Sequence, residues 1–313
     1  KIIEFFDILN TPEQDRQKAL DEDLTIFPYV DGSLFKERIR IPSFDSGTRK
    51  ILLDCCQFDW ELVSPAIFGS MFQSVMDQTE RHSLGAHYTS EKNILKTINS
   101  LFLEQLTKEF ENHKNNKQYL KEMILRIGKI KVLDPACGCG NFLIIAYREL
   151  RRLQVKIRKQ LVKLEGREAQ QVLNITFDAD LNVDSMYGIE LLEFPARIAQ
   201  VGLWLMDHLI NMELSKEFGI YYKRLPLTKT ANIKIENALR IKWKDFISKE
   251  EVSYIIGNPP FVSKQDRDKS QQEDMDLVCK SIDNYGLLDY VCCWYVKAAE
   301  YIQGTNISVA FVS

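Results

Sequence analysis

The feature that most restricts the fold is a short apolar segment that runs into a glycine-rich turn and then into a long amphipathic helix. Residues 131–134, Lys-Val-Leu-Asp, have the character of a buried strand. The turn contains Gly138 and Gly140, which tolerate positive φ and let a ligand approach the backbone closely. Apolar residues then recur at helical spacing over 143–164. Strand, glycine turn and helix in this order predict the first unit of a doubly wound α/β sheet.

Further apolar segments of strand length alternate with segments long enough for helices. The predicted strands are 131–134, 186–190, 232–236, 253–257 and 307–312. Strands that alternate with helices predict a mostly parallel sheet. We expect this sheet in a domain of residues 85–313, preceded by a mostly helical N-terminal module of residues 1–84.

Local signals also predict individual helices. In the N-terminal module we expect helices at 49–63 and 65–78, the second with Ser64 as N-cap and Pro65 at its first position. Ser90 is the expected cap of a helix through about residue 111, and a turn at 112–118 precedes a helix to about residue 127.

The tetrapeptide Asn258-Pro259-Pro260-Phe261 directly follows the predicted strand 253–257. Each proline lacks an N–H and has a fixed φ, so the chain stops pairing here. The tetrapeptide therefore holds two carbonyls, the Asn258 side chain and the Pro259 backbone, in a stiff frame beside an aromatic ring. Two acceptors beside a ring suit a planar ligand that carries an exocyclic amino group. The simpler alternative is a tight turn after a strand.

A dinucleotide is the obvious ligand for the glycine turn, but the pattern argues against it. Leu143 stands where the dinucleotide fingerprint has its third small residue, and no acidic residue follows at the usual distance. The next predicted strand instead ends in Glu190, whose carboxylate can accept both hydroxyls of a ribose. These features favour a ligand with a ribose and a carboxylate but no pyrophosphate, such as S-adenosylmethionine.

Four motifs, in this order, resemble those of the adenine-N6 DNA methyltransferases. They are 85–90 (Gly-Ala-His-Tyr-Thr-Ser), 133–143 (Leu-Asp-Pro-Ala-Cys-Gly-Cys-Gly-Asn-Phe-Leu), 188–190 (Gly-Ile-Glu) and 258–261 (Asn-Pro-Pro-Phe). Segments 27–35 and 66–72 resemble the region before the methylase in single-polypeptide restriction–modification enzymes of types IIG and IIL. The resemblance covers nearly the whole chain.

This resemblance implies a fold, a reaction and partners. The fold is that of class I S-adenosylmethionine-dependent methyltransferases, with sheet order 3-2-1-4-5. Two more strands are expected beyond Ser313, which would leave the catalytic domain cut short. The implied reaction transfers a methyl group from S-adenosylmethionine to the N6 amine of an adenine flipped out of double-stranded DNA, within a restriction–modification system. A target-recognition domain is expected outside this segment.

The resemblance also assigns roles to residues that match the motifs. The catalytic set is Asn258, Pro259, Pro260 and Phe261. The cofactor set is Tyr88 and Thr89 at the methionine end, Asp134, Ala136, Gly138 and Gly140 along the methionine and sulfonium, Glu190 at the ribose, and Asn237 near the cofactor adenine. Asn237 departs from the family, which usually has Asp there. An amide oxygen can still accept from the adenine amine.

Composition limits the remaining possibilities. The net charge of −3 is unusual for a DNA enzyme, but the expected recognition domain would make many of the DNA contacts. The basic side chains of the helix after the glycine turn are expected to form a solvated face rather than a phosphate-binding stripe. The seven cysteines lack paired Cys-x-x-Cys spacing, so no metal site is expected, and adjacent cysteines are expected to be buried. Without a signal peptide or an apolar run of membrane-spanning length, a cytoplasmic location is expected.

Two alternative functions remain open at this point. A methyltransferase with an Asn-Pro-Pro-aromatic loop can also act on a glutamine side-chain amide or an RNA base amine, although segments 85–90 and 27–35 favour DNA. The chain can instead be a non-catalytic component of a restriction-like complex, and a decayed active site would be the sign of that.

Overall fold

The computed structural model describes residues 2–27, 29, 43–59, 63–75, 89–165, 181–218 and 231–312. The chain divides into two compact units, the first made of residues 1–64 and 211–230 and the second of residues 65–210 and 231–313. Residues 84 and 85 lie outside the described residues, so a domain boundary at that point stays a prediction.

The first unit is helical over much of its described length. Its elements are α1 (Ile2–Leu9), the 3-10 turn η1 (Glu13–Asp15), α2 (Glu22–Thr25) and α3 (Ser46–Gln57). The Arg16 guanidinium donates to the carbonyls of Ile8 (3.1 Å) and Phe27 (2.8 Å), which ties α1 to the segment after α2. The predicted helix at 49–63 begins earlier, because the Asp45 side chain caps it by accepting from the Thr48 N–H (2.7 Å).

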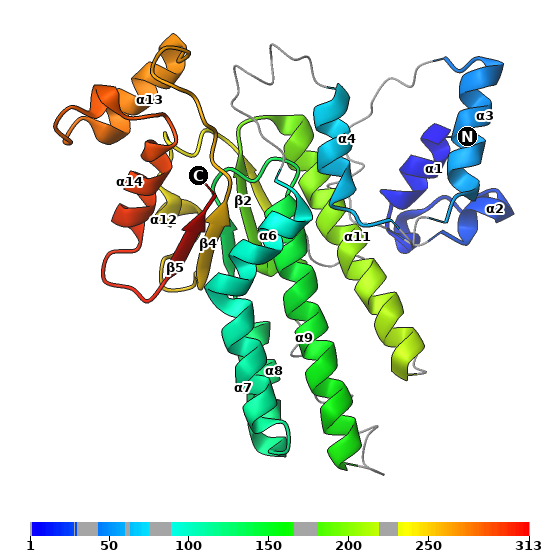
Figure 1. Ribbon diagram of the computed structural model, residues 1–313. Helices are drawn as coiled ribbons and strands as arrows, with labels where there is room; N and C mark the ends of the chain where they lie inside the picture. Colours follow the sequence, from blue (N-terminus) through cyan, green and yellow to red (C-terminus); the bar gives the residue numbers. More distant parts are fainter. Residues whose placement is uncertain are drawn as a thin grey trace. The chain divides into compact units, whose positions relative to one another are not determined.

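The second unit contains a five-stranded parallel sheet (Figure 1). Its strands are β1 (Val132–Asp134), β2 (Met186–Glu190), β3 (Asn232–Ile235), β4 (Tyr254–Gly257) and β5 (Ser308–Phe311). Their order is β3-β2-β1-β4-β5, and every pairing is parallel. The predicted α/β class, strand positions and strand order are confirmed. Leu133 pairs with Tyr187 on one side and Ile255 on the other, so the carboxyl ends of the strands share one edge.

The helices and helical turns of this part of the chain precede or connect the strands. They are α4 (Ile67–Val75), α6 (Glu91–Ile98), the π-helical turn η3 (Asn99–Leu103), α7 (Glu104–His113), α8 (Lys117–Gly128), α9 (Asn141–Glu165), the 3-10 turn η5 (Val183–Ser185), α11 (Glu193–Phe218), α12 (Trp243–Phe246), α13 (Lys269–Cys279), the 3-10 turn η6 (Tyr285–Leu287) and α14 (Cys292–Tyr301). α4 starts later than predicted because Pro65 and Ala66 form a turn, so Ser64 does not cap it. Ser90 does precede α6, but its carbonyl rather than its hydroxyl accepts the first helical hydrogen bonds.

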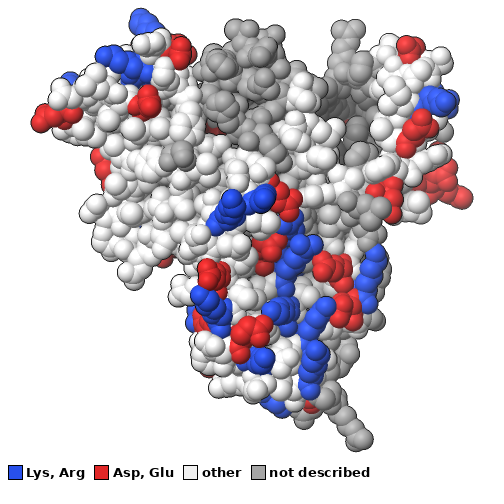
Figure 2. All heavy atoms as spheres, viewed as in Figure 1, with Lys and Arg blue, Asp and Glu red and all other residues white. Residues whose placement is uncertain are grey.

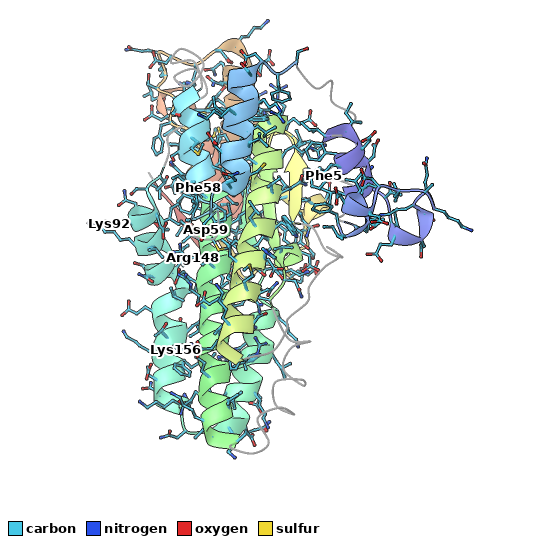
Figure 3. All side chains as sticks on the ribbon, turned by 90° about the vertical axis from the view of Figure 1, so that its right-hand side faces the viewer. Phe5, Phe58, Asp59, Lys92, Arg148 and Lys156 are labelled. Carbon is cyan, nitrogen blue, oxygen red and sulfur yellow. The ribbon has the colours of Figure 1, made fainter. Side chains whose placement is uncertain are left out.

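The arginines of α9 correct the expectation of a solvated basic face. Arg148, Arg151 and Arg158 are buried, and both α6 and α8 pack against α9. Arg148 is neutralised by Glu91 (2.7 Å), whereas Lys156 stays exposed and pairs with Glu111 (2.8 Å). Figure 3 shows Arg148 and Lys156 at different heights along this helix. On the face drawn in Figure 2, basic and acidic side chains intermingle over the long helices instead of forming a basic stripe.

The cysteines follow the expectation only where their helix is packed. Cys293 is buried in the core, with its Sγ 3.6 Å from that of Cys279, whereas the adjacent Cys292 is only half-buried. Cys55 and Cys56 are exposed instead, which corrects the expectation of buried adjacent cysteines. The reason is that α3 buries no residue at all. Among the described residues, no helix has both the length and the apolar character of a membrane span.

Candidate active site

The predicted site residues gather at the carboxyl edge of the sheet. Asp134 ends β1, Glu190 ends β2, and Asn258 directly follows β4. Asn237 stands two residues beyond β3, beside Glu190, since the Glu236 N–H donates to the Glu190 carbonyl (2.9 Å). The strand order reverses between β1 and β4, and the crevice at such a point is where open α/β sheets bind ligands.

The glycine turn is fastened to β2 by Glu190. The Gly138 N–H donates to Glu190 Oε2 (2.9 Å), and the Leu192 N–H donates to Oε1 (2.9 Å). Burial raises the pKa of Glu190, and these backbone hydrogen bonds oppose that rise. A carboxylate offers about four acceptor sites, so the carboxylate can still accept from two hydroxyls of a ribose.

The two glycines of the turn serve different purposes. Gly138 has φ +53° and a Cβ added there would meet no atom within 4 Å, so its backbone faces open space. Gly140 has φ +82°, and a Cβ there would lie 2.8 Å from the Cβ of Ala199 on α11. Gly138 therefore leaves room for a ligand, whereas Gly140 is a glycine because α11 packs against the turn.

Asp134 is the buried acid of the site, only 1% exposed. Its Oδ1 accepts from the Ala136 N–H (3.0 Å), while its buried Oδ2 has no hydrogen-bond partner among the described residues. Burial raises the pKa of Asp134 to about 8, helped by the charge of Glu190. Gly257 lies directly against it, because a Cβ at Gly257 would come within 2.5 Å of Oδ1. A buried acceptor such as Oδ2, without a hydrogen-bond partner among the described residues, suits a ligand that brings an ammonium or another N–H donor.

Thr89 and Asn258 meet although they are far apart in the sequence. The Asn258 Nδ2 donates to the Thr89 Oγ1 (2.9 Å), and Thr89 is only 9% exposed. In this arrangement the amide nitrogen faces Thr89, so the carbonyl oxygen is the end that can accept from a substrate amine. Tyr88, the other residue predicted for this region, lies outside the described residues.

The remaining residues of the tetrapeptide differ in exposure. Pro259 is buried, and Pro260 and Phe261 are half-buried after the last paired residues of β4. Tyr290 secures the segment behind them, because its N–H donates to the Val262 carbonyl (3.1 Å). Phe261 is half-buried, so part of its aromatic side chain stays accessible.

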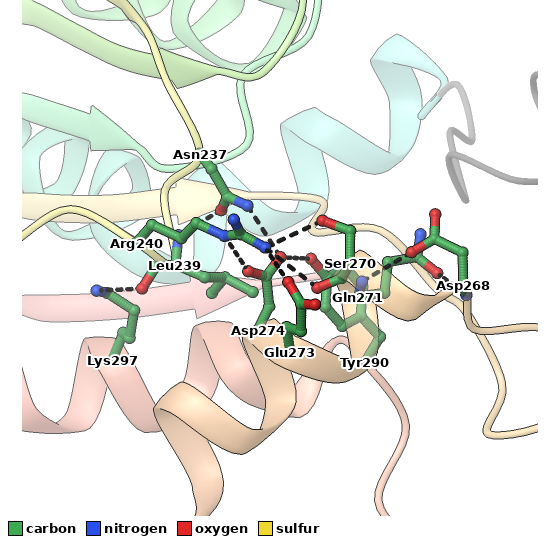
Figure 4. Close-up of polar contacts among 10 residues, drawn as sticks. All are labelled: Asn237, Leu239, Arg240, Asp268, Ser270, Gln271, Glu273, Asp274, Tyr290 and Lys297. Carbon is green, nitrogen blue, oxygen red and sulfur yellow. Dashed lines mark hydrogen bonds and ion pairs between the residues drawn. The ribbon is translucent and has the colours of Figure 1, made fainter.

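Asn237 has a more constrained setting than the sequence suggested. Its Oδ1 accepts from the Leu239 N–H (2.9 Å), and its Nδ2 donates to the Asp274 Oδ2 (2.9 Å) (Figure 4). Asp274 is buried and was not anticipated, because Glu273 and Asp276 beside it make the segment look like an exposed acidic face.

A second support that sequence reasoning missed lies under the glycine turn. The Trp294 Nε1 donates to the Pro135 carbonyl (3.0 Å), so α14 holds the start of the turn. No signal within either segment indicates this contact, since it joins residues that the sheet brings together.

The thiols of the glycine turn are not reactive groups. Burial raises the pKa of Cys139 to about 12 and raises that of Cys137 well above its usual range. Both thiols therefore stay protonated and serve as small packing residues. Within the part of the chain that the structure describes, no cluster of three His, Cys, Asp or Glu side chains could hold a metal ion.

The sheet is parallel, with a glycine turn after β1, an acid at the end of β2 and Asn-Pro-Pro-Phe after β4. These features define an α/β protein of the class I methyltransferase type. Residues 110–313 match the family model described as the MmeI DNA-methyltransferase domain. The chain belongs to this family.

Known proteins agree with this assignment. The chain is similar to a solved structure of the type IIL restriction–modification enzyme MmeI in complex with DNA, with 50% identity and a TM-score of 0.91 over 99% of this chain and 41% of that one. It is 37% identical to DNA methyltransferase A of Bacillus subtilis, over 99% of this chain and 35% of the relative. A putative type II restriction enzyme and methyltransferase of Methanocaldococcus jannaschii is 25% identical over 81% of this chain and 24% of its own length. The chain thus spans well under half the length of each of these relatives.

Proposed function

We propose that this chain is the catalytic segment of a restriction–modification enzyme that methylates the N6 amine of adenine in double-stranded DNA. The observation that carries the proposal is the contact between Asn258 and Thr89, which turns the amide nitrogen toward Thr89 and leaves the amide oxygen as the acceptor, in the same tetrapeptide as the half-buried Phe261. The family membership and the DNA-bound relative support DNA as the substrate class.

The residues present fit S-adenosylmethionine as the methyl donor. Glu190 would take the ribose hydroxyls, and the open backbone at Gly138 would lie along the methionine part. The buried Oδ2 of Asp134 is the acceptor that the cationic part of the ligand would satisfy. When bound, this cofactor supplies an electrophilic methyl group on a sulfonium.

Asn258 and Pro259 would activate the target amine. The N6 lone pair of adenine is delocalised into the ring, so the free amine is a poor nucleophile. Hydrogen bonds from the amine to the Asn258 side-chain carbonyl and the Pro259 backbone carbonyl favour a pyramidal nitrogen, whose lone pair is localised. Because positioning supplies much of the rate, the stiffness of the Pro-Pro segment matters as much as its polarity. An adenine in a duplex must be flipped out to reach this site, where stacking on Phe261 contributes about 1–3 kcal/mol.

Label transfer tests the proposal directly. The intact protein is incubated with tritiated S-adenosylmethionine and, separately, duplex DNA, RNA and a glutamine-containing protein substrate, and the acceptors are digested and analysed. We expect label in N6-methyladenine from DNA. Label in RNA or in glutamine, or in another base, would refute the proposed substrate.

A matched pair of variants then tests the site. Asn258→Ala should abolish transfer but leave cofactor affinity unchanged, because the amide acts on the amine. Ser263→Ala changes a hydroxyl in the same loop that contacts Asp266 (2.7 Å) and should leave transfer unchanged. Full turnover by Asn258→Ala would mean that another group holds the amine.

A further inference from the structure

We infer that Asp274 is a positioning residue for the cofactor adenine: its carboxylate fixes the Asn237 amide with the oxygen, not the nitrogen, as the acceptor for the adenine amine. This inference rests on the proposed function, because it requires a ligand with an adenine at the edge of β3. It explains why an amide works at a position where the family usually has a carboxylate.

The contacts of Asn237 fix the orientation of its side-chain amide. An amide group can rotate by half a turn, which exchanges the positions of its oxygen and nitrogen, and a ligand amine can donate only to the oxygen. Two contacts select the same orientation, since Leu239 N–H needs an acceptor (2.9 Å) and Asp274 Oδ2 needs a donor (2.9 Å). The Asn237 oxygen has a second lone pair, which is the one an adenine amine would use.

Several contacts hold Asp274 in place, as is required of a group that positions another side chain. Asp274 is 1% exposed and accepts from the Tyr290 hydroxyl (2.7 Å) and from the Arg240 Nε, which balances its charge. Arg240 is held in turn by the Ser270 Oγ (3.0 Å). Figure 4 shows these side chains converging on Asp274 from α13 and from the segments after β3 and before α14.

The charge of the Asp274 carboxylate favours an amide over a second carboxylate at position 237. A carboxylate at position 237 would stand about where the Asn237 Nδ2 now lies, 2.9 Å from the Asp274 carboxylate. Two carboxylates so close cannot both ionise at neutral pH. Asn237 would supply the acceptor oxygen that Asp usually supplies in the adenine-N6 DNA methyltransferases, and it also donates to Asp274. The amide at position 237 and the buried acid at position 274 therefore act as a pair.

The affinities for two related ligands together report the orientation of the Asn237 amide. S-adenosylhomocysteine and S-inosylhomocysteine differ in presenting an amine or a carbonyl at the same purine position. The intact protein should prefer the adenosyl ligand, because the Asn237 oxygen accepts from the amine and repels the carbonyl. In Asp274→Ala one of the two contacts that orient the amide is lost, and the ratio of the two affinities by calorimetry should fall about tenfold.

The ratio of the two affinities distinguishes a positioning role from a general loosening of the fold, because loosening weakens the binding of both ligands alike. Gln272→Ala is the matched control, since it removes a hydrogen bond of the same helix, to Asp276 (2.8 Å), but leaves the contacts of Asp274, and it should keep the wild-type ratio. An unchanged ratio in folded Asp274→Ala, or an equal fall in Gln272→Ala, would overturn the inference. If the wild-type protein binds neither ligand, the proposed function fails as well.

Asn237→Asp decides the question if Asp274→Ala does not fold. The new carboxylate faces Asp274, and the ionisable groups around that acid among the described residues include Arg240, Glu273, Tyr290 and Cys293. One of the two acids should keep its proton to higher pH and then donate as the amide does. Affinity for S-adenosylhomocysteine, relative to wild type, should therefore fall about tenfold between about pH 6 and about pH 9. A constant relative affinity would refute the pairing.

Discussion

Replacing Thr89 by valine should slow methyl transfer without weakening cofactor binding. Valine has nearly the shape of threonine but lacks the hydroxyl, so the Asn258 amide N–H loses the acceptor that now lies 2.9 Å away. Because Thr89 is 9% exposed, little water can replace that hydroxyl. The amide is then free to rotate, and its oxygen leaves the place from which it would accept from the target amine.

The size of the effect follows from the cost of the lost contact. A buried donor left without an acceptor costs about 1–3 kcal/mol. If this free energy is lost from the transition state, the rate falls by roughly 5- to 150-fold, since about 1.4 kcal/mol corresponds to tenfold. Thr89→Ser keeps the hydroxyl and should retain most of the rate.

Two measurements separate the possible roles of Thr89. Initial rates of tritiated methyl transfer at saturating cofactor and DNA give kcat, and calorimetry gives the cofactor Kd. We expect kcat to fall in Thr89→Val while Kd changes by less than about threefold, which is under 1 kcal/mol. A normal kcat with a much weaker Kd would refute the reasoning and assign the hydroxyl to the cofactor, as the sequence comparison with the family suggested.

Further predictions concern the glycine turn, the buried acid and the buried arginine. Gly140→Ala should lower the unfolding temperature more than Gly138→Ala, because only Gly140 is packed against α11, while Gly138→Ala should mainly weaken cofactor binding in calorimetry. Asp134→Asn should abolish cofactor binding yet stabilise the ligand-free protein. Burial raises the pKa of Asp134 from 3.8 to about 8, so wild-type stability falls as the pH rises between these values. Urea unfolding of both proteins at about pH 5 and about pH 8 should show that the stability gained by Asp134→Asn grows with pH, on the order of 1 kcal/mol per pH unit. An equal gain at both pH values would contradict this prediction. Arg148→Ala should cost about 2 kcal/mol in the same assay and Lys156→Ala less than about 0.5 kcal/mol, since Arg148 is buried and Lys156 exposed.

The fold was accessible from the sequence because its signals are local. The apolar segments that form β1 to β5 are flanked by turns and helices, and each observed strand lies within one residue of its predicted bounds. The order of the strands came from the resemblance to a family. The positions of Asp134, Glu190 and Asn258 at one edge follow, because parallel strands end on the same side of a sheet.

Helix ends and helix faces were less predictable. Asp45 rather than a residue near 49 caps α3, and the buried side of α9 includes Arg148, Arg151 and Arg158. The periodicity of α9 identifies its apolar positions but does not show that other helices cover the basic ones. Burial of an arginine depends on partners such as Glu91, which come from another helix.

The sequence by itself thus determined the class of sheet, the order of its motifs and the chemistry available at its edge, because these depend on residue types and their spacing. The tertiary structure alone decided the contacts that orient those groups. Thr89 reaches Asn258 across 169 positions of the chain, and Asp274 reaches Asn237 across 37. Such contacts are absent from any local pattern, since only the packing of the helices and loops around the sheet brings the two partners within hydrogen-bonding distance.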